Sequence, residues 1–312
     1  MGNIATREAY GKALAELGEK HKNIVVLDAD LSKSTKTHEF EKKYPERFFN
    51  IGISEQDLMG TAAGLATCGK IPFASTFAMF ASGRAFEQVR NSIAYPNLNV
   101  RIAATHSGIT VGEDGASHQA IEDIAIMRAI PNMTVINPAD AVTTTKAIEE
   151  SLKYKGPMYI RLGRLAVPEV YSDDVDYKIG KGILLKEGKD AAIIATGFMV
   201  HLALEAADLL KDDGIEARVI DMHTIKPIDK DLIIESAKKT GAIVTAEEHN
   251  IIGGLGGAVA EVLSEECPAP MVRVGIKDIF GQSGKPMELV KLYEISALDI
   301  ALAVKKVKKF AR

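Results

Sequence analysis

The sequence of 312 residues contains no tryptophan and only two cysteines, Cys68 and Cys267. The two cysteines lie far apart in sequence and form no CxxC pair, so the closely spaced cysteine motifs of redox and zinc sites are excluded. The N-terminus, MGNIATREAY, lacks the apolar core of a signal peptide. Sparse cysteine without such a signal predicts a protein of a reducing compartment, the cytoplasm.

Long apolar runs and an excess of charge are missing too. The longest apolar candidate, AAIIATGFMV at 191–200, is interrupted by Gly197 and is shorter than the roughly eighteen residues of a membrane span. A formal net charge of -4 and a pI near 6.0 give no electrostatic footprint for nucleic acid or an anionic membrane. We therefore expect a soluble protein that binds neither nucleic acid nor membrane.

What is present is a regular alternation of short β-branched runs and longer helical patterns. Strands are expected at 23–30, 99–105, 133–138 and 158–162, with helices at 6–21 and 138–156. Alternation of this kind predicts βα units around a largely parallel sheet. The chain length and a hydrophobic fraction of 46% allow about two such domains.

The alternation breaks once, after Arg164. The stretch LAVPEVYSDDVDYKIGKG has prolines, tyrosines and acids but no helical period, and strand-like runs resume with DAAIIATG, EARVIDMH, GAIVTAEEHN and MVRVGI. We predict an α/β protein with two domains, each a largely parallel sheet flanked by helices. The domains are expected at 1–165 and 189–312, with a linker at 166–188.

Three segments resemble known functional motifs but lack a residue that each motif requires. GGLGG at 253–257 precedes a helical pattern, but Val259 stands where a dinucleotide fingerprint needs its third glycine, so we read these glycines as allowing close helix–sheet approach. GISEQ at 52–56 ends on Gln56 rather than the glycine of a nucleophile elbow. THEF at 37–40 lacks the second histidine of a zinc helix, and no metal site is predicted in this chain.

Two segments carry polar residues suited to a site. In THSGITVGEDGASHQ, His106 and His118 stand twelve positions apart, and glycines and small residues predict a loop. In GISEQDLMGTAAGLATCGK, Ser54 is a plausible helix N-cap and Glu55 begins a helix of small residues. A carboxylate stabilised by the helix dipole and a carboxyl in an apolar interface that shares a proton with a ligand are equally open for Glu55.

Phe77 and Phe80 follow in IPFASTFAMFASGR, at a strand-to-helix turn. Their rings would either plug the core or wall a flat heterocycle. From the residues alone, the core interpretation is favoured.

The order of GISEQ, STFAMFASGRAFEQVR, THSGITVGEDGASHQAIED and YIRLGRLAVP, followed by a second α/β domain, resembles the C-terminal half of transketolase, a thiamine diphosphate enzyme. The resemblance runs from about residue 4 to the end, and GEDGxxHQ is its most specific part. The family's GDG…N signature, which holds Mg2+ and the diphosphate, does not occur in this sequence.

The resemblance therefore implies one subunit of a split transketolase, with a pyrimidine-binding domain and a transketolase C-terminal domain. An N-terminal partner subunit would supply GDG…N and the Mg2+ ligands. Two copies of each chain would complete two sites. The implied reaction transfers a two-carbon ketol group from a ketose phosphate to an aldose phosphate in the pentose phosphate pathway.

The resemblance also assigns roles toward the cofactor. Glu55 matches the glutamate that hydrogen-bonds a ring nitrogen of the aminopyrimidine of thiamine diphosphate, which activates the cofactor as its own base. Phe80 matches the aromatic residue that packs on the pyrimidine, with Phe77 beside it. Asp30 is expected to order its corner of the site and to help hold the cofactor.

Toward the sugar phosphate, His118 and Asp114 match residues that contact hydroxyls next to the reacting carbon, with His118 as a proton shuttle. The phosphate-side contacts implied are Arg7, Ser34, His106 and Arg164, with Arg161 as the alternative to Arg164. Glu113 is interpreted as a structural carboxylate that accepts backbone hydrogen bonds. SEQ in place of the family's REH, and Ser107 in place of an aspartate, leave the preferred sugar open.

Two other thiamine diphosphate enzymes are alternatives: a deoxyxylulose phosphate synthase fragment and the β subunit of a 2-oxo acid dehydrogenase. GEDGASHQ together with the Thr105–His106 pair favours transketolase over both. A non-catalytic binding paralogue with the same fold is the alternative of another class. The retained set of Glu55, Asp114, His118 and Arg164 argues against it.

Overall fold

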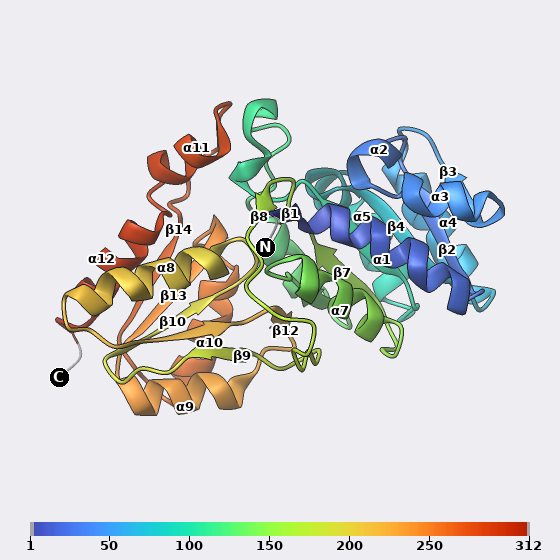
Figure 1. Cartoon of the computed structure of the whole chain (residues 1–312). Coiled ribbons are helices and arrows are strands. Elements are labelled where there is room, and N and C mark those ends of the chain that lie inside the picture. Colours follow the sequence, from blue (N-terminus) through green and yellow to red (C-terminus); the bar gives the residue numbers. More distant parts are fainter. Residues whose placement is uncertain (1–2, 311–312) are drawn as a thin grey trace.

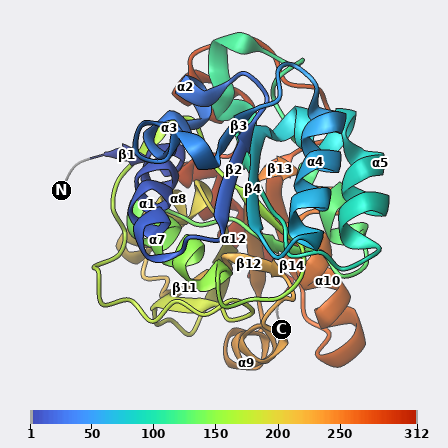
Figure 2. The same cartoon turned by 90° about the vertical axis from the view of Figure 1, so that its right-hand side faces the viewer.

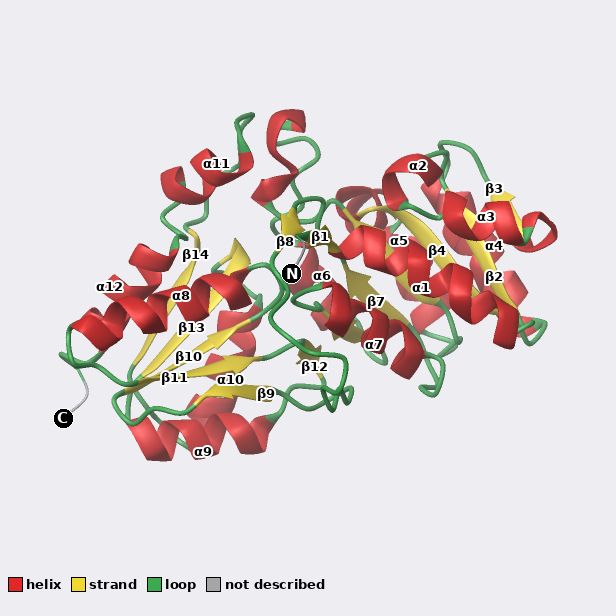
Figure 3. Ribbon diagram, viewed as in Figure 1, coloured by secondary structure: helices red, strands yellow, loops and turns green. Residues whose placement is uncertain are grey.

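The computed structural model describes residues 3–310 and places them in two α/β units side by side (Figure 1). A seven-stranded sheet forms the centre of the first unit and a five-stranded sheet the centre of the second. In each unit the strands lie between helices (Figure 3). The predicted fold class, two α/β domains with largely parallel sheets, is confirmed.

The first sheet is parallel throughout except at one edge. Its strands, in spatial order, are β12 (Thr224–Lys226), β6 (Thr134–Ile136), β7 (Met158–Arg161), β5 (Arg101–Thr105), β4 (Ile71–Phe77), β2 (Ile24–Asp28) and β3 (Phe48–Asn50). Only β12 runs antiparallel to its neighbour, β6. Strands β2, β4, β5 and β7 are buried along their whole length, as a sheet covered on both faces requires.

Helices cover both faces of this sheet (Figure 2). Helices α1 (Thr6–Lys20), α3 (His38–Lys43) and α7 (Ala141–Ser151) pack together on one face. The other face carries α4 (Glu55–Thr67), α5 (Phe86–Gln88) and α6 (Asp123–Ala129). Shorter elements are α2 (Ser32–Thr35), the π-helical turns η2 (Phe80–Arg84) and η3 (Val89–Ala94), and the 3-10 helices η1 (Pro45–Arg47) and η4 (Ile109–Asp114).

The second sheet has the strand order β14 (Met271–Ile276), β13 (Ile243–Asn250), β10 (Ala191–Ala195), β11 (Ala217–Asp221) and β9 (Ile183–Lys186). All pairs are parallel except β9 with β11. Helices α8 (Met199–Asp212) and α12 (Ala297–Val307) pack on one face, and α9 (Lys230–Thr240) and α10 (Leu255–Glu266) on the other (Figure 1). Helix α11 (Pro286–Leu292) lies beside η4 of the first unit.

The strands and helices expected from the sequence are present, with ends that differ by a few residues. Two features differ from expectation. Strand β9 and the short strand β8 (Ala166–Val167), which pairs with β1 (Ile4–Ala5), both fall inside 166–188, so regular structure begins before residue 189. Strand β12 comes from the second half of the chain but forms an edge of the first sheet, so the second half contributes a strand to the first unit.

The two units also share a hydrophobic core. One cluster of buried side chains runs from Val25 and Ile102 of the first sheet to Ile194 and Val259 of the second unit. No helix within residues 3–310 is long and apolar enough to cross a bilayer.

Candidate active site

The carboxyl ends of β4 and β5 bring four aromatic rings together. Phe77 ends β4 and stacks on His106, just past β5, with ring centroids 3.8 Å apart. Phe80 stacks on Phe77 at 5.9 Å, and His118 meets Phe80 edge-on at 5.4 Å. Parallel strands end at one edge of the sheet, where open α/β folds bind ligands. The two histidines of the loop thus meet on one aromatic pair.

Glu55 is the first residue of α4 and only 1% exposed, and Arg84, whose guanidinium lies over the Phe80 ring, links it to this aromatic pair. Its carboxylate accepts hydrogen bonds from Arg84 Nη1 at 2.8 Å and from Thr76 Oγ1 at 3.4 Å. Ser54 precedes the helix as predicted, but its side chain makes no capping bond. Glu55 begins α4 as predicted, and the structure shows the burial that the sequence left open: Glu55 is buried although Gln56 and Asp57 beside it are exposed.

Arg84 was not found by the sequence analysis. Its guanidinium lies 4.4 Å from the centroid of the Phe80 ring, close enough for a cation–π contact, while it pairs with Glu55. Phe80 and Arg84 are the first and last residues of the π-helical turn η2, and their four-residue spacing places both side chains on the same side of this turn. That spacing was the available signal, but the partner on α4 is 29 residues away in sequence.

His106 has a fixed protonation pattern. Arg7 Nη1 lies 3.3 Å from His106 Nε2, and arginine only donates, so Nε2 is the acceptor and Nδ1 carries the proton toward Thr105 Oγ1 at 2.9 Å. Burial, followed by the charges of Arg7 and Arg164, lowers the pKa of His106 to about 3. His106 is therefore neutral at physiological pH. Arg7 also donates to the carbonyl oxygen of Ser34 at 2.8 Å, which joins three of the expected phosphate-side residues.

Arg164 stands at the outer side of this corner with a side chain that is 35% exposed. It donates to the Val111 carbonyl and lies 3.4 Å from Glu113 Oε2 and 3.9 Å from Asp114 Oδ2. Glu113 was expected to accept backbone hydrogen bonds; its carboxylate pairs with Arg164 instead. Two arginines around a neutral histidine make a corner suited to an anion.

Arg161 is used differently. Its side chain is 2% exposed, its Nε donates to Asp123 Oδ2 at 2.8 Å, and its Nη2 donates to the carbonyls of Ala120 and Glu248. Buried arginines bound in this way are structural. Arg161, the alternative to Arg164, is therefore already taken up by the protein, and Arg164 is the arginine with accessible donors.

The remaining residues expected at the site are more exposed, and within residues 3–310 no hydrogen bond or ion pair joins Asp30 to the aromatic pair or to the arginines. Asp114 is exposed, and His118 is half-buried with Nδ1 2.9 Å from Ser117 Oγ. Asp30 is exposed and accepts a hydrogen bond from Asn50. The ordering expected of Asp30 comes from Asp28, which binds Leu31 N–H and the hydroxyls of Thr35 and Thr37.

The segment 105–119, predicted to be a loop, contains the short 3-10 helix η4, which Gly112 interrupts at φ 84°. Gly108 and Gly115 on either side also have positive φ, 76° each. These glycines let six residues coil tightly although they cannot form a regular helix. Ser107 is buried and donates to the Leu162 carbonyl at 3.1 Å, so its hydroxyl ties the segment to the end of β7.

GGLGG follows β13 and opens α10 as the sequence indicated. The carboxylate of Glu247 accepts the N–H groups of Leu255 and Gly256 at 2.7 and 2.8 Å. The glycines leave room for this close approach, as predicted. Within residues 3–310, no group of three histidines, cysteines or carboxylates is arranged to hold a metal ion.

A buried carboxyl, an aromatic wall and a cationic corner at the carboxyl edge of a parallel sheet are features suited to a ligand with a flat ring and an anionic group. Comparison with known proteins identifies the family to which this chain belongs. The model of the transketolase pyrimidine-binding domain matches residues 2–169, and that of the transketolase C-terminal domain matches residues 180–300. The chain belongs to the transketolase family.

Several relatives are named as a section or a subunit of a transketolase, or as a split gene transketolase. A protein of Methanocaldococcus jannaschii, whose name assigns it provisionally to a transketolase C-terminal section, is 55% identical over 95% of this chain and 93% of its own length. A 6-deoxy-6-sulfo-D-fructose transketolase subunit of Clostridium sp. is 43% identical over 96% of this chain and 94% of its own. A solved structure, described as a split gene transketolase, inactive beta4 tetramer, is 61% identical with a TM-score of 0.93, covering 99% of this chain and 100% of that one. The chain is thus a transketolase-type subunit of a split transketolase.

Proposed function

We propose that this chain forms the pyrimidine-binding half of a thiamine diphosphate-dependent transketolase, which transfers a two-carbon ketol group from a ketose phosphate to an aldose phosphate. The buried carboxyl of Glu55, linked through Arg84 to the Phe77–Phe80 pair, carries the proposal. The residues fit the pyrimidine half of the cofactor: a flat ring requires an apolar wall, and its ring nitrogen requires a partner such as this carboxyl. The GDG…N signature is absent from the sequence, so we assign Mg2+ and the diphosphate to an N-terminal partner subunit.

Each side chain then has one task. When bound, thiamine diphosphate supplies the carbon nucleophile that takes up the ketol group. Glu55 hydrogen-bonds the pyrimidine nitrogen, and Phe77 and Phe80 exclude water from that face. A poorly hydrated carboxyl makes a stronger and more directional hydrogen bond than an exposed one.

On the sugar side, Arg7 and Arg164 bind the phosphate at the cationic corner, with Ser34 close by. Neutral His106 accepts from Arg7 and donates to Thr105, which keeps its ring stacked on Phe77. Asp114 accepts a hydrogen bond from a sugar hydroxyl, and His118 moves a proton to or from the hydroxyl next to the reacting carbon. We place Asp30 at the cofactor's edge.

The sulfosugar named for the Clostridium relative is the second candidate substrate. A sulfonate and a phosphate are both oxyanions that arginines bind, so the cationic corner suits either. The names of the split relatives support transketolase over a deoxyxylulose phosphate synthase fragment or a 2-oxo acid dehydrogenase β subunit. A role in the pentose phosphate pathway in the cytoplasm is part of the proposal.

Reconstitution tests the proposal. The purified chain is expected to show negligible ketol transfer and weak cofactor affinity, and mixing it with a partner chain that contains GDG and a downstream asparagine should produce Mg2+-dependent transfer between sugar phosphates. Magnesium-dependent activity of the isolated chain would overturn the split-subunit assignment. A reconstituted complex that binds cofactor but transfers nothing would favour the non-catalytic paralogue.

The same complex tests Glu55. Glu55→Ala should lower kcat by at least about a hundredfold, the usual range for a lost acid–base group, while the unfolding midpoint stays close to that of the wild type. Asp57→Ala is the matched control, because Asp57 lies on the same helix turn but is exposed. Equal activity of the two variants would show that Glu55 has been given the wrong role.

A further inference from the structure

The second unit touches the segment that carries the proposed sugar contacts, residues 105–119, here called the histidine segment. Glu248, at the end of β13, is 3% exposed, and its Oε1 accepts the N–H of Thr110 at 2.6 Å. Thr110 lies in the first turn of η4, between His106 and Asp114. A side chain of the second unit thus satisfies a buried backbone donor in the middle of the proposed sugar site.

The fit around this carboxylate is tight. A Cβ atom added to Gly108 would lie 2.2 Å from Glu248 Cδ, so the carboxylate occupies the space beside the glycine backbone. Gly108 has φ 76°, a conformation that glycine adopts without strain. The bend that follows His106 is therefore shaped to receive Glu248.

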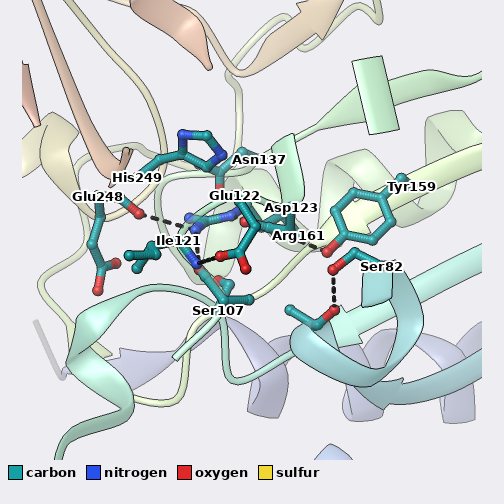
Figure 4. A network of polar contacts seen from close by, with 12 residues as sticks. Ser82, Ser107, Ile121, Glu122, Asp123, Asn137, Tyr159, Arg161, Glu248 and His249 are labelled. Carbon is teal, nitrogen blue, oxygen red and sulfur yellow. Dashed lines mark hydrogen bonds and ion pairs between the residues drawn. The ribbon is translucent and has the colours of Figure 1, made fainter. Parts of the chain in front are cut away.

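Glu248 is itself held in place from the first unit (Figure 4). Its backbone carbonyl accepts from Arg161 Nη2 at 3.0 Å, and Arg161 pairs with Asp123, which also accepts from Tyr159 at 2.8 Å. The neighbouring His249 Nε2 accepts the Ala125 N–H at 3.3 Å. This buried network fixes the backbone at Glu248 and leaves its carboxylate directed at Thr110.

The far end of the histidine segment is also held by the second unit. Gln119 Nε2 donates to the carbonyls of Ile109 and Gly112, at 3.2 and 3.3 Å, and to Gln282 of the second unit at 2.9 Å. A Cβ atom on Gly115 would lie 2.5 Å from Ser283 Oγ. Both ends of η4 are therefore fitted against the second unit, one against Glu248 of β13 and the other against the segment that follows β14.

We infer that Glu248 is a positioning residue for ketol transfer: by accepting the Thr110 N–H across the unit boundary, it sets the distance between His106, at the anion end, and Asp114 and His118, at the reacting end. The inference rests on the proposed function for the roles of those three residues. It gives the second unit a task in catalysis that requires no contact with substrate. Misplacing contacts by about 1 Å costs up to a hundredfold in rate, so the effect is measurable.

Three substitutions separate reach from charge. Glu248→Gln keeps an oxygen acceptor at the same length; burial raises the pKa of Glu248 to about 7, so the neutral amide also resembles the protonated acid. Glu248→Asp keeps the acid but is one methylene too short to reach Thr110. Glu248→Ala removes the acceptor. Glu261→Ala is the matched control, because Glu261 pairs with Arg128 across the same boundary, away from the histidine segment.

The first measurement is amide hydrogen exchange of peptides covering 105–119 in the full-length chain. Faster exchange is expected at these peptides in the Ala and Asp variants, with wild-type exchange in Glu248→Gln and Glu261→Ala. Exchange in the Ala and Asp variants that matches the wild type would overturn the inference. If the Ala variant does not fold, the comparison of Asp with Gln decides alone.

The second measurement is kinetics in the reconstituted complex. The Asp and Ala variants should lose 10- to 100-fold in kcat/KM for the sugar phosphate while cofactor affinity stays within about twofold, and Gln should restore most of the loss. Equal loss in the Gln and Ala variants would contradict the inference. If the wild-type complex has no transketolase activity, the proposed function fails, whereas the exchange measurement still tests the contact.

Discussion

At the scale of single residues, burial decides between side chains that the sequence presents as equals. YIRLGR offers two arginines three positions apart, and the family resemblance allows either to bind phosphate. Arg161 lies on β7 and is 2% exposed, with its donors used by Asp123 and two carbonyls. Arg164 lies past the end of the strand and keeps about a third of its side chain exposed. One arginine supports the fold, and the other keeps donors accessible for the proposed phosphate contact.

Replacing each arginine by alanine should separate these roles. Arg161→Ala leaves Asp123 charged and buried, which costs about 3–5 kcal/mol of unfolding free energy. Arg164→Ala should change stability by less than about 1 kcal/mol, because its ion pairs are exposed, but should raise KM for the sugar phosphate about tenfold or more. Urea unfolding and steady-state kinetics of the reconstituted complex measure both. A stable Arg161→Ala protein would mean that the Asp123 pair is dispensable.

At the scale of elements, α10 shows how a glycine cluster and a buried acid depend on each other. Glu247 points from β13 into the first turn of α10 and accepts two of the N–H groups that a helix start leaves unpaired. A Cβ atom on Gly254 would lie 2.0 Å from Glu247 Oε2, so only glycine permits this cap. At Gly257 the nearest atom to an added Cβ, Arg128 Nη1, is 3.6 Å away, an ordinary contact.

Alanine substitutions at these two glycines are expected to act in opposite directions. Gly254→Ala should lower the free energy of unfolding by about 1–3 kcal/mol, because the carboxylate must move and leave buried donors unpaired. Gly257→Ala should be neutral or stabilising by up to about 1 kcal/mol, because alanine in a helix loses less backbone entropy than glycine. Chemical denaturation of the two variants in parallel provides the test. Equal destabilisation would show that the helix rejects any side chain, independent of Glu247.

At the scale of the whole molecule, the sequence predicts what is local and misses what joins distant segments. Alternating patterns located most strands of both sheets, and the small residues after Glu55 predicted that it begins a helix, although its burial stayed one of two open interpretations. The three-residue strand β12, which crosses to the first sheet, has too little pattern to be assigned. Arg84 and Glu248 were missed because their partners lie 29 and 138 residues away. Which polar side chains meet across the unit boundary depends on packing of the complete fold.

The buried ionisable groups have opposing effects on stability. Burial lowers the pKa of three histidines to about 3 or 4, namely His106, His223 and His249. The unfolded chain binds more protons at these sites below about pH 6.5, so they reduce stability as the pH falls. Burial raises the pKa of three carboxyl groups to about 7 or 8, namely Asp221, Glu247 and Glu248. The folded chain still holds those protons after the unfolded chain has lost them near pH 4, so stability declines as the pH rises from about 4 and levels off above the folded pKa values of about 7 to 8.

The ionisation of Asp221 allows the loss of stability with rising pH to be tested at a single residue. It is fully buried, accepts a hydrogen bond from Tyr171 at 2.7 Å, and has a pKa of about 8 in the fold against 3.8 ordinarily. Asp221→Asn keeps an acceptor for Tyr171 but cannot ionise. The unfolding free energy of the variant should therefore fall less steeply between pH 6.5 and 8 than that of the wild type, by up to about 1.4 kcal/mol per pH unit. Urea unfolding across this range measures the slope, with Asp212→Asn, an exposed aspartate, as the control. Parallel pH profiles for the wild type and Asp221→Asn would show that Asp221 is already ionised in the fold. Its charge would then have to be balanced by the surrounding hydrogen bonds.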